Sequence, residues 1–267
     1  MDQIFTNLTW ENHSGKVGDN DGPAYVVYSN KGYYKASEAV AVGGIEQNLV
    51  RRSDGKTVNA YLFLGIDVYD GATGEWRNCA DAGLAFRGAD CGFHAFVNRF
   101  MVEDCEKSWW ESQEELDRTH DFEIVLDTSE KANWLKLTII DITAGNKTVD
   151  SKSFPMKGTL PDGSNTAYYQ DYAIDFPDDV CDDKREHDFR DWDHVMAYNE
   201  NENLYLKNIR ISEATLYGPS GSRPWTEECT EERFLWPDRT RKINYVCTTV
   251  YNVQKDRELI IELDMNR

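Results

Sequence analysis

Aromatic side chains are the groups in this chain best suited to contact an uncharged ligand. The sequence holds 8 Trp, 14 Tyr and 11 Phe. A rigid ring can cover the C–H face of a sugar with little loss of entropy, while neighbouring amides and carboxylates bond the sugar hydroxyls. The alternative for each ring is a place in the core or at its edge. The candidates in loops or at the ends of predicted strands are Trp76, Trp109, Trp110, Tyr168, Tyr169 and Trp192.

Trp109 and Trp110 are adjacent in a polar stretch between predicted strands. Ser108 offers an N-cap, and acidic residues follow over 111–115, which predicts one short helical insertion. Two adjacent rings in such an insertion cannot both face a core easily, so we expect at least one to be exposed and to contact the ligand. In the alternative, the helix folds over the protein and buries both rings as a lid on the core.

His94 and Asn98 are four residues apart in the predicted strand Phe93–Val102. Because side chains alternate along a strand, they share a face with Phe96 and Phe100. If that face is concave and wet, His94 and Asn98 can bond sugar hydroxyls. If it is the core face, His94 is a buried histidine with a satisfied hydrogen bond, and we slightly prefer this placement.

Two acidic runs suggest a calcium site. Calcium takes about six to eight oxygen ligands, often from a loop that wraps around it. Asp19-Asn20-Asp21-Gly22 resembles part of an EF-hand loop, but Val17 stands where the first acidic ligand belongs, so it is not an EF-hand. We expect a structural calcium ion on this run or on Asp178-Asp179. The alternative for the second run is a solvated acidic face without metal.

Composition excludes several partners. The chain has 29 Lys+Arg against 48 Asp+Glu, a net charge of −19, which repels nucleic-acid phosphates and anionic lipid heads. No stretch approaches the roughly 20 apolar residues that span a bilayer. The first residues lack the features of a signal peptide, so either the chain is cytosolic or Met1 replaces a removed leader. We prefer a secreted or cell-surface protein.

The 6 cysteines form no C-x-x-C pair, which argues against a structural zinc site. Cys79, Cys91 and Cys105 flank successive predicted strands, where cross-links are geometrically plausible. Buried free thiols are the equal alternative.

Alternation of apolar and polar residues predicts a chain made mainly of strands. Val58–Tyr69, Asp81–Gly88 and Phe93–Val102 are joined by short turns, so they must form an antiparallel meander. Further segments bring the total to about a dozen strands, which is typical of an all-β, antiparallel two-sheet β-sandwich. Residues 1–218 form this sandwich domain. Residues 219–267 form a C-terminal extension with two strands, too small for its own core and expected to pack on the main domain.

The strand pattern resembles the concanavalin A-like lectin and glucanase superfamily, whose members are jelly-roll β-sandwiches. The paired strands at 82–88 and 92–98, the run from 122–127 through 135–141, and the strand at 204–211 carry the resemblance. They cover about half of the chain, and the match is to the order of strands, not to a signature motif. The resemblance implies a concave sheet that binds glycans.

Glucanases of this superfamily use the motif Glu-x-Asp-x-Glu on one strand. The nearest run here is Glu262-Leu263-Asp264-Met265-Asn266, in which Asn266 replaces the acid that would donate a proton. No nucleophile elbow, P-loop or H-E-x-x-H motif occurs. The sequence therefore favours non-catalytic carbohydrate binding by an extracellular module. Two alternatives stay open: a polysaccharide-degrading hydrolase or lyase on the same fold, and a structural or adhesion module.

Overall fold

The protein is an antiparallel β-sandwich. A computed structural model describes residues 2–3, 24–52, 54–88, 92–100, 109–164, 166–174, 203–236, 248–253 and 257–264. These residues form one sheet of ten strands and one of seven, and every recorded strand pair is antiparallel. Among them there is no α-helix. The predicted all-β fold class is confirmed.

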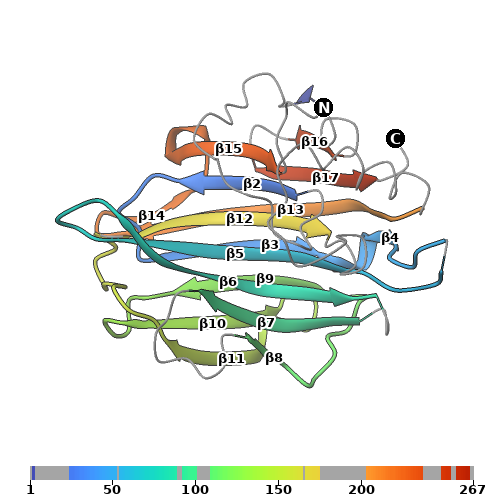
Figure 1. Cartoon of the computed structure of the whole chain (residues 1–267), viewed down its shortest axis with the longest axis horizontal. Helices are drawn as coiled ribbons and strands as arrows, with labels where there is room; N and C mark the ends of the chain where they lie inside the picture. Colours follow the sequence, from blue (N-terminus) through green and yellow to red (C-terminus); the bar gives the residue numbers. More distant parts are fainter. Residues whose placement is uncertain are drawn as a thin grey trace.

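Figure 1 shows the strands of both sheets running across the view, with β15 near one end and β8 near the other. The seven-stranded sheet has the spatial order β15 (Thr230–Trp236), β2 (Ala24–Ser29), β12 (Thr166–Ile174), β5 (Asn59–Tyr69), β6 (Trp76–Arg87), β7 (Gly92–Phe100) and β8 (Trp109–Glu111). The main path of the other sheet is β1 (Asp2–Gln3), β16 (Thr248–Val253), β17 (Glu258–Asp264), β13 (Tyr205–Gly218), β3 (Lys35–Ala41), β9 (Asp121–Asp127), β10 (Trp134–Asp141) and β11 (Lys147–Pro155). Off this path, β4 (Glu46–Asn48) and β14 (Gly221–Pro224) pair with β13, and two 3₁₀ turns are η1 (Val42–Gly44) and η3 (Glu227–Cys229).

The predicted meander is the centre of the seven-stranded sheet. Strand β5 pairs along its length with β6, and β6 pairs with β7. Alternate residues of β5, such as Leu62, Leu64 and Ile66, are fully buried in the core between the two sheets. That core also takes side chains from the facing sheet, including Ile124 of β9.

The predicted helix around Trp109 is wrong. Residues Trp109–Glu111 form the edge strand β8, which pairs with β7 through Asn98↔Trp109 and Phe96↔Glu111. The capping and charge signals that favour a helix are worth a few tenths of a kcal/mol to about 1 kcal/mol each, and the open edge of β7 offers a ladder of backbone hydrogen bonds instead. Because neighbouring residues of a strand face opposite ways, the two tryptophans separate.

The last part of the chain pairs with strands that precede it. Strand β15 lies against β2, β17 lies against β13, and β14 turns back on β13 through Gly218 and Gly221. Strand β13 has a bulge at Lys207-Asn208, seen as a register shift between Leu206 and Ile209, where the apolar–polar alternation of the sequence also slips. Cys229 is a buried free thiol. The division into units at residue 218 stays a prediction.

A fragment of residues 219–267 expressed alone should not fold. Its strands β15 and β17 would lose the partners β2 and β13, and isolated β-hairpins are marginal in water at best. The fragment should show poorly dispersed amide signals in an NMR spectrum, whereas the whole chain should show well-dispersed ones. A well-dispersed spectrum of the isolated fragment would contradict this expectation.

Candidate functional site

The outer face of the seven-stranded sheet carries a second apolar cluster, separate from the core between the sheets. Its buried members all come from this one sheet: Ala24, Val26, Phe63, Ala85, Phe96 and Tyr169. They are the strand residues that alternate with the core residues, so they point away from the facing sheet. These six side chains are nevertheless 6% exposed or less, and the accessible part of the face is formed by the half-buried rings packed on them, Tyr28, Tyr61 and Trp109.

An aromatic row crosses this face from β2 to β8. It consists of Tyr28, Tyr169, Phe63, Phe96 and Trp109, with Tyr61 beside its β8 end. Successive ring centroids are 4.9, 6.2, 5.7 and 5.1 Å apart. These separations fall in the range in which aromatic pairs stabilise each other. The rings therefore form one continuous, mutually supported cluster, with the half-buried Tyr28 and Trp109 at its two ends.

Two glycines make the row possible. Gly83 of β6 lies between Phe63 and Phe96 in the strand register, and a Cβ there would lie 2.5 Å from the carbonyl oxygen of Leu62. Gly65 of β5 is the register partner of Tyr169, and a Cβ there would overlap the Tyr169 ring. Without side chains at these two positions, the rings of neighbouring strands can lie over the backbone of the sheet.

A hollow of about 560 Å³ lies at the β8 end of the row. Arg87 Nε donates a hydrogen bond of 2.8 Å to Glu111 Oε1, and the same two side chains form an ion pair. Trp109 Nε1 donates to Glu111 Oε2 at 3.2 Å, and the Arg87 guanidinium lies 5.3 Å from the Trp109 ring centroid. The described residues that line the hollow are Asn59, Arg87, His94, Trp109, Glu111, Ser112 and Gln113.

Glu111 is held ionised in this hollow. Its partial burial by itself would raise the pKa of the carboxyl, but the hydrogen bond and charge of Arg87, together with the Trp109 N–H, lower the pKa below its ordinary value. Glu111 is also the only carboxylate among the described lining residues. A general acid needs a raised pKa and glycoside hydrolysis needs a pair of carboxyl groups. An ionised carboxylate held by Arg87 can accept hydrogen bonds from a ligand.

Away from the hollow, two aromatic side chains donate hydrogen bonds to carboxylates on the same face. The Tyr169 hydroxyl donates to Asp81, and Trp76 Nε1 donates to Asp67 at 3.1 Å. Burial and then the charge of Asp81 raise the pKa of Tyr169 well above its ordinary value, so its hydroxyl stays protonated and keeps donating. Trp76 is 42% exposed although it is a large apolar residue.

The structure brings five of the predicted site residues to this one face. Trp109 and His94 line the hollow, Asn98 is the register partner of both Asp81 and Trp109, and Tyr169 belongs to the aromatic row. Trp76 lies near the other end, bonded to Asp67. His94 therefore faces outward, contrary to the placement preferred from the sequence. Period-two alternation fixes which residues share a face but cannot tell which face meets the second sheet.

Two predicted site residues face the other way. Tyr168 is completely buried in the core between the sheets, where its hydroxyl lies 3.5 Å from Thr128 Oγ1. Trp110 packs at the edge of that core, with its ring centroid 5.4 Å from that of Phe154 on β11 and Lys152 over its face. Each is the strand neighbour of an outward residue, so alternation places it inward. Tyr168 and Trp110 are therefore not part of the candidate site.

Several other predictions fall outside the described residues. Trp192 and the proposed calcium ligands Asp19, Asn20, Asp21, Asp178 and Asp179 are among them. Within the described ranges, no group of three or more His, Cys, Asp or Glu side chains could hold a metal ion. Likewise, no described helix has the length and apolar character needed to cross a membrane.

Sequence reasoning missed Arg87 and Glu111. One sequence signal pointed to Arg87: it shares a strand face with Gly83 and Ala85, because the three residues stand at alternate positions of their predicted strand. No sequence signal pointed to Glu111, because its segment was predicted to be a helix and not a strand paired with β7. The acids of the Glu262–Asn266 run that the structure describes lie elsewhere: Asp264 belongs to β17 of the other sheet, where Lys207 Nζ lies 2.5 Å from its carboxylate.

No protein-family model and no curated protein sequence matches this chain. Among solved structures, a functionally unknown protein from Saccharomyces cerevisiae is 10% identical, with a TM-score of 0.30 over 57% of this chain and 73% of that one. A tail fiber protein from an E. coli phage is 11% identical, with a TM-score of 0.21 over 55% of this chain and 15% of that one. Both likenesses are too weak to carry an argument about function.

Proposed function

We propose that the outer face of the seven-stranded sheet binds carbohydrate without modifying it. The observation that supports this most is the junction of the aromatic row with the polar hollow at Trp109. A sugar has apolar C–H patches and a rim of hydroxyls. A site that binds it therefore needs an aromatic ring beside hydrogen-bond donors and acceptors. The hollow supplies amides from Asn59 and Gln113 and a fixed carboxylate from Glu111.

The size and charge of the site fit this ligand class. A volume of about 560 Å³ is within the range of small-molecule sites, which is about 300–1,000 Å³. An uncharged sugar is indifferent to the net charge of −19, which repels polyanions. The same proposal includes an extracellular or cell-surface location, which rests on composition alone. A structural calcium ion on the acidic loops stays a prediction.

Replacing Trp109 with alanine should weaken glycan binding roughly thirtyfold or more, because a central aromatic contact of this kind typically carries about 2 kcal/mol or more. A glycan array should first identify a ligand for the whole chain, and isothermal titration calorimetry should then compare the variants. Trp134→Ala is the matched control: it removes a tryptophan that begins β10 on the other sheet, beside Lys131.

The two variants separate a failed proposal from a damaged fold. Equal affinity of Trp109→Ala and the unmodified chain would remove the hollow from the binding site. A loss that appears equally in Trp134→Ala would point to a general structural effect. If the array detects no glycan, the carbohydrate proposal fails, and the adhesion alternative takes its place.

A further inference from the structure

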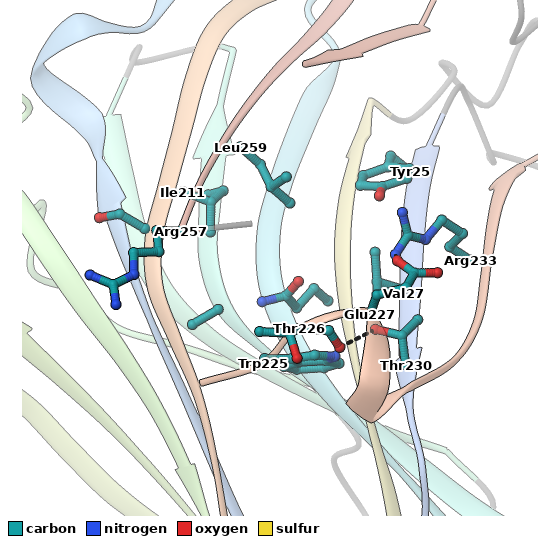
Figure 2. A pocket seen from close by; sticks show the side chains of 13 residues that line it. Tyr25, Val27, Ile211, Trp225, Thr226, Glu227, Thr230, Arg233, Arg257 and Leu259 are labelled. Atoms are coloured by element: carbon teal, nitrogen blue, oxygen red, sulfur yellow. Dashed lines mark hydrogen bonds and ion pairs between the residues drawn. The ribbon is translucent and has the colours of Figure 1, made fainter. Parts of the chain in front are cut away.

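A second pocket lies between the two sheets, on the opposite side of the seven-stranded sheet from the aromatic row. Figure 2 shows Trp225 at the bottom of the view, Ile211 and Leu259 on one side, and Tyr25, Val27 and Arg233 on the other. Its walls come from β2, β12, β13 and β17, and the connection from β14 to β15 closes it. Two of its lining residues, Glu227 and Arg257, are exposed.

Buried N–H donors line this pocket. Trp225 is only 6% exposed, and its Nε1 has no hydrogen-bond partner in the described part of the chain. The Nε of Arg233 is likewise buried and unpartnered among the described residues. A buried polar group that lacks a partner costs about 1–3 kcal/mol, so something that accepts hydrogen bonds is expected here.

The hydroxyls nearby do not supply the missing acceptor. Thr230 Oγ1 donates to the carbonyl oxygen of Thr226 at 3.0 Å, the dashed line in Figure 2. The backbone N–H of Trp225 is satisfied by the carbonyl oxygen of Ala214 at 2.8 Å. Gln170, which also lines the pocket, has a buried Nε2 without a hydrogen-bond partner among the described residues. The side-chain donors of Trp225, Arg233 and Gln170 are thus the groups that remain for a ligand.

The local charge favours an anion. Arg233 and Arg257 line the pocket, and Glu227 is the only carboxylate among its described lining residues. Glu227 forms an ion pair with Arg233 through Nη2, which leaves the Arg233 Nε–H unused. The Glu227 side chain is 67% exposed, so water screens its charge more than that of the buried guanidinium edge. Figure 2 shows the Arg257 guanidinium turned away from the pocket, so the positive charge next to the unpartnered donors is that of Arg233.

The size of the cavity limits the ligand. Its volume is about 40 Å³. On this measure one water needs about 10–15 Å³, so the cavity holds roughly three waters, or a group of about three or four non-hydrogen atoms. A whole sugar ring does not fit, and a carboxylate group does.

We propose that this pocket is a binding site for a carboxylate group, held by Trp225 Nε1–H and Arg233 Nε–H. Both donors are N–H groups, and a carboxylate accepts from both without needing a donor of its own. Hydrogen bonds that involve a charged partner are the stronger ones, so the charge of Arg233 adds to the binding. The site is independent of the carbohydrate proposal.

The test uses the indole N–H signals of the whole chain labelled with ¹⁵N-tryptophan. Formate is titrated at constant ionic strength against chloride, and acetate and glucuronate form two further arms. One indole signal should shift saturably with formate, and that signal should be missing in Trp225→Phe. A response to glucuronate as well would show that the site takes a carboxyl group carried by a sugar.

Arg233→Lys keeps a positive charge but removes the Nε–H, and it should weaken formate binding roughly tenfold. Trp134→Phe is the control, and it should leave the shift intact. The remaining indole signals report whether each variant is folded. If no carboxylate causes a saturable shift, the donors are served by water only and the proposal fails. A shift that persists in Trp225→Phe would also overturn it.

Discussion

The free energy of unfolding of the unmodified protein should fall as the pH rises from about 5 to about 8, and in Glu38→Gln most of this fall should be absent. Glu38 lies on β3 with its side chain completely buried between the sheets. Its Oε2 accepts a hydrogen bond of 2.7 Å from the Tyr172 hydroxyl. Burial raises the pKa of Glu38 to about 8, although the hydrogen bond from Tyr172 opposes the rise.

The direction in which the free energy of unfolding changes with pH follows from proton binding. The unfolded carboxyl loses its proton near its ordinary pKa of 4.5, whereas the folded one keeps it to about pH 8. Between these values the native state binds more protons than the unfolded state, so the free energy of unfolding falls as the pH rises. The loss is about 1.4 kcal/mol per pH unit, or on the order of 5 kcal/mol in all. Below the lower pKa the stabilisation is complete, and above the upper one it is gone.

Urea unfolding at a series of pH values measures this effect. The difference between Glu38→Gln and the unmodified chain isolates Glu38 from other titrating groups, such as His120 beside Asp141. In Tyr172→Phe, the carboxylate loses a donor, so the falling part of the curve should extend to higher pH. Parallel pH profiles for Glu38→Gln and the unmodified chain would show that the carboxyl does not hold its proton in the folded state.

Gly65→Ala should destabilise the protein by roughly 1–3 kcal/mol, the usual cost of extra volume in a packed site. The new Cβ would overlap the outer atoms of the Tyr169 ring. The ring cannot easily move, because Tyr28 stacks on it and its hydroxyl is bonded to Asp81. The same change should disturb the aromatic row and weaken glycan binding.

A double-mutant cycle tests this cause directly. Tyr169→Leu removes the ring atoms that the Cβ would overlap, so Gly65→Ala should cost little in that background. Denaturant unfolding of the two single variants and the double variant gives the coupling energy. If Gly65→Ala costs the same with and without the Tyr169 ring, the penalty comes from the backbone of β5 and not from the aromatic row.

Local sequence was enough to place most strands. The alternation in residues 121–127 gives β9 with the same bounds, and the slipped alternation at Lys207-Asn208 marks a real bulge. The turn residues after Tyr69 and before Phe93 were enough to predict the antiparallel meander, because short turns permit no other arrangement. Alternation also grouped His94 and Asn98 with Phe96 on one face. These features depend on neighbours in the chain.

Tertiary structure decided the rest. Strand β5 is apolar on both sides, with Leu62 on one and Phe63 on the other, so its sequence alone does not say which side meets the second sheet. Trp109–Glu111 became a strand because β7 offered an unpaired edge, a fact that no local helix signal contains. The sequence does not show why Gly65 and Gly83 must be glycines. The reason appears only in the strand register, which places aromatic residues beside them. Strand pairing between distant segments sets the faces, the edges and the register, and so it fixes which side chains can form a site.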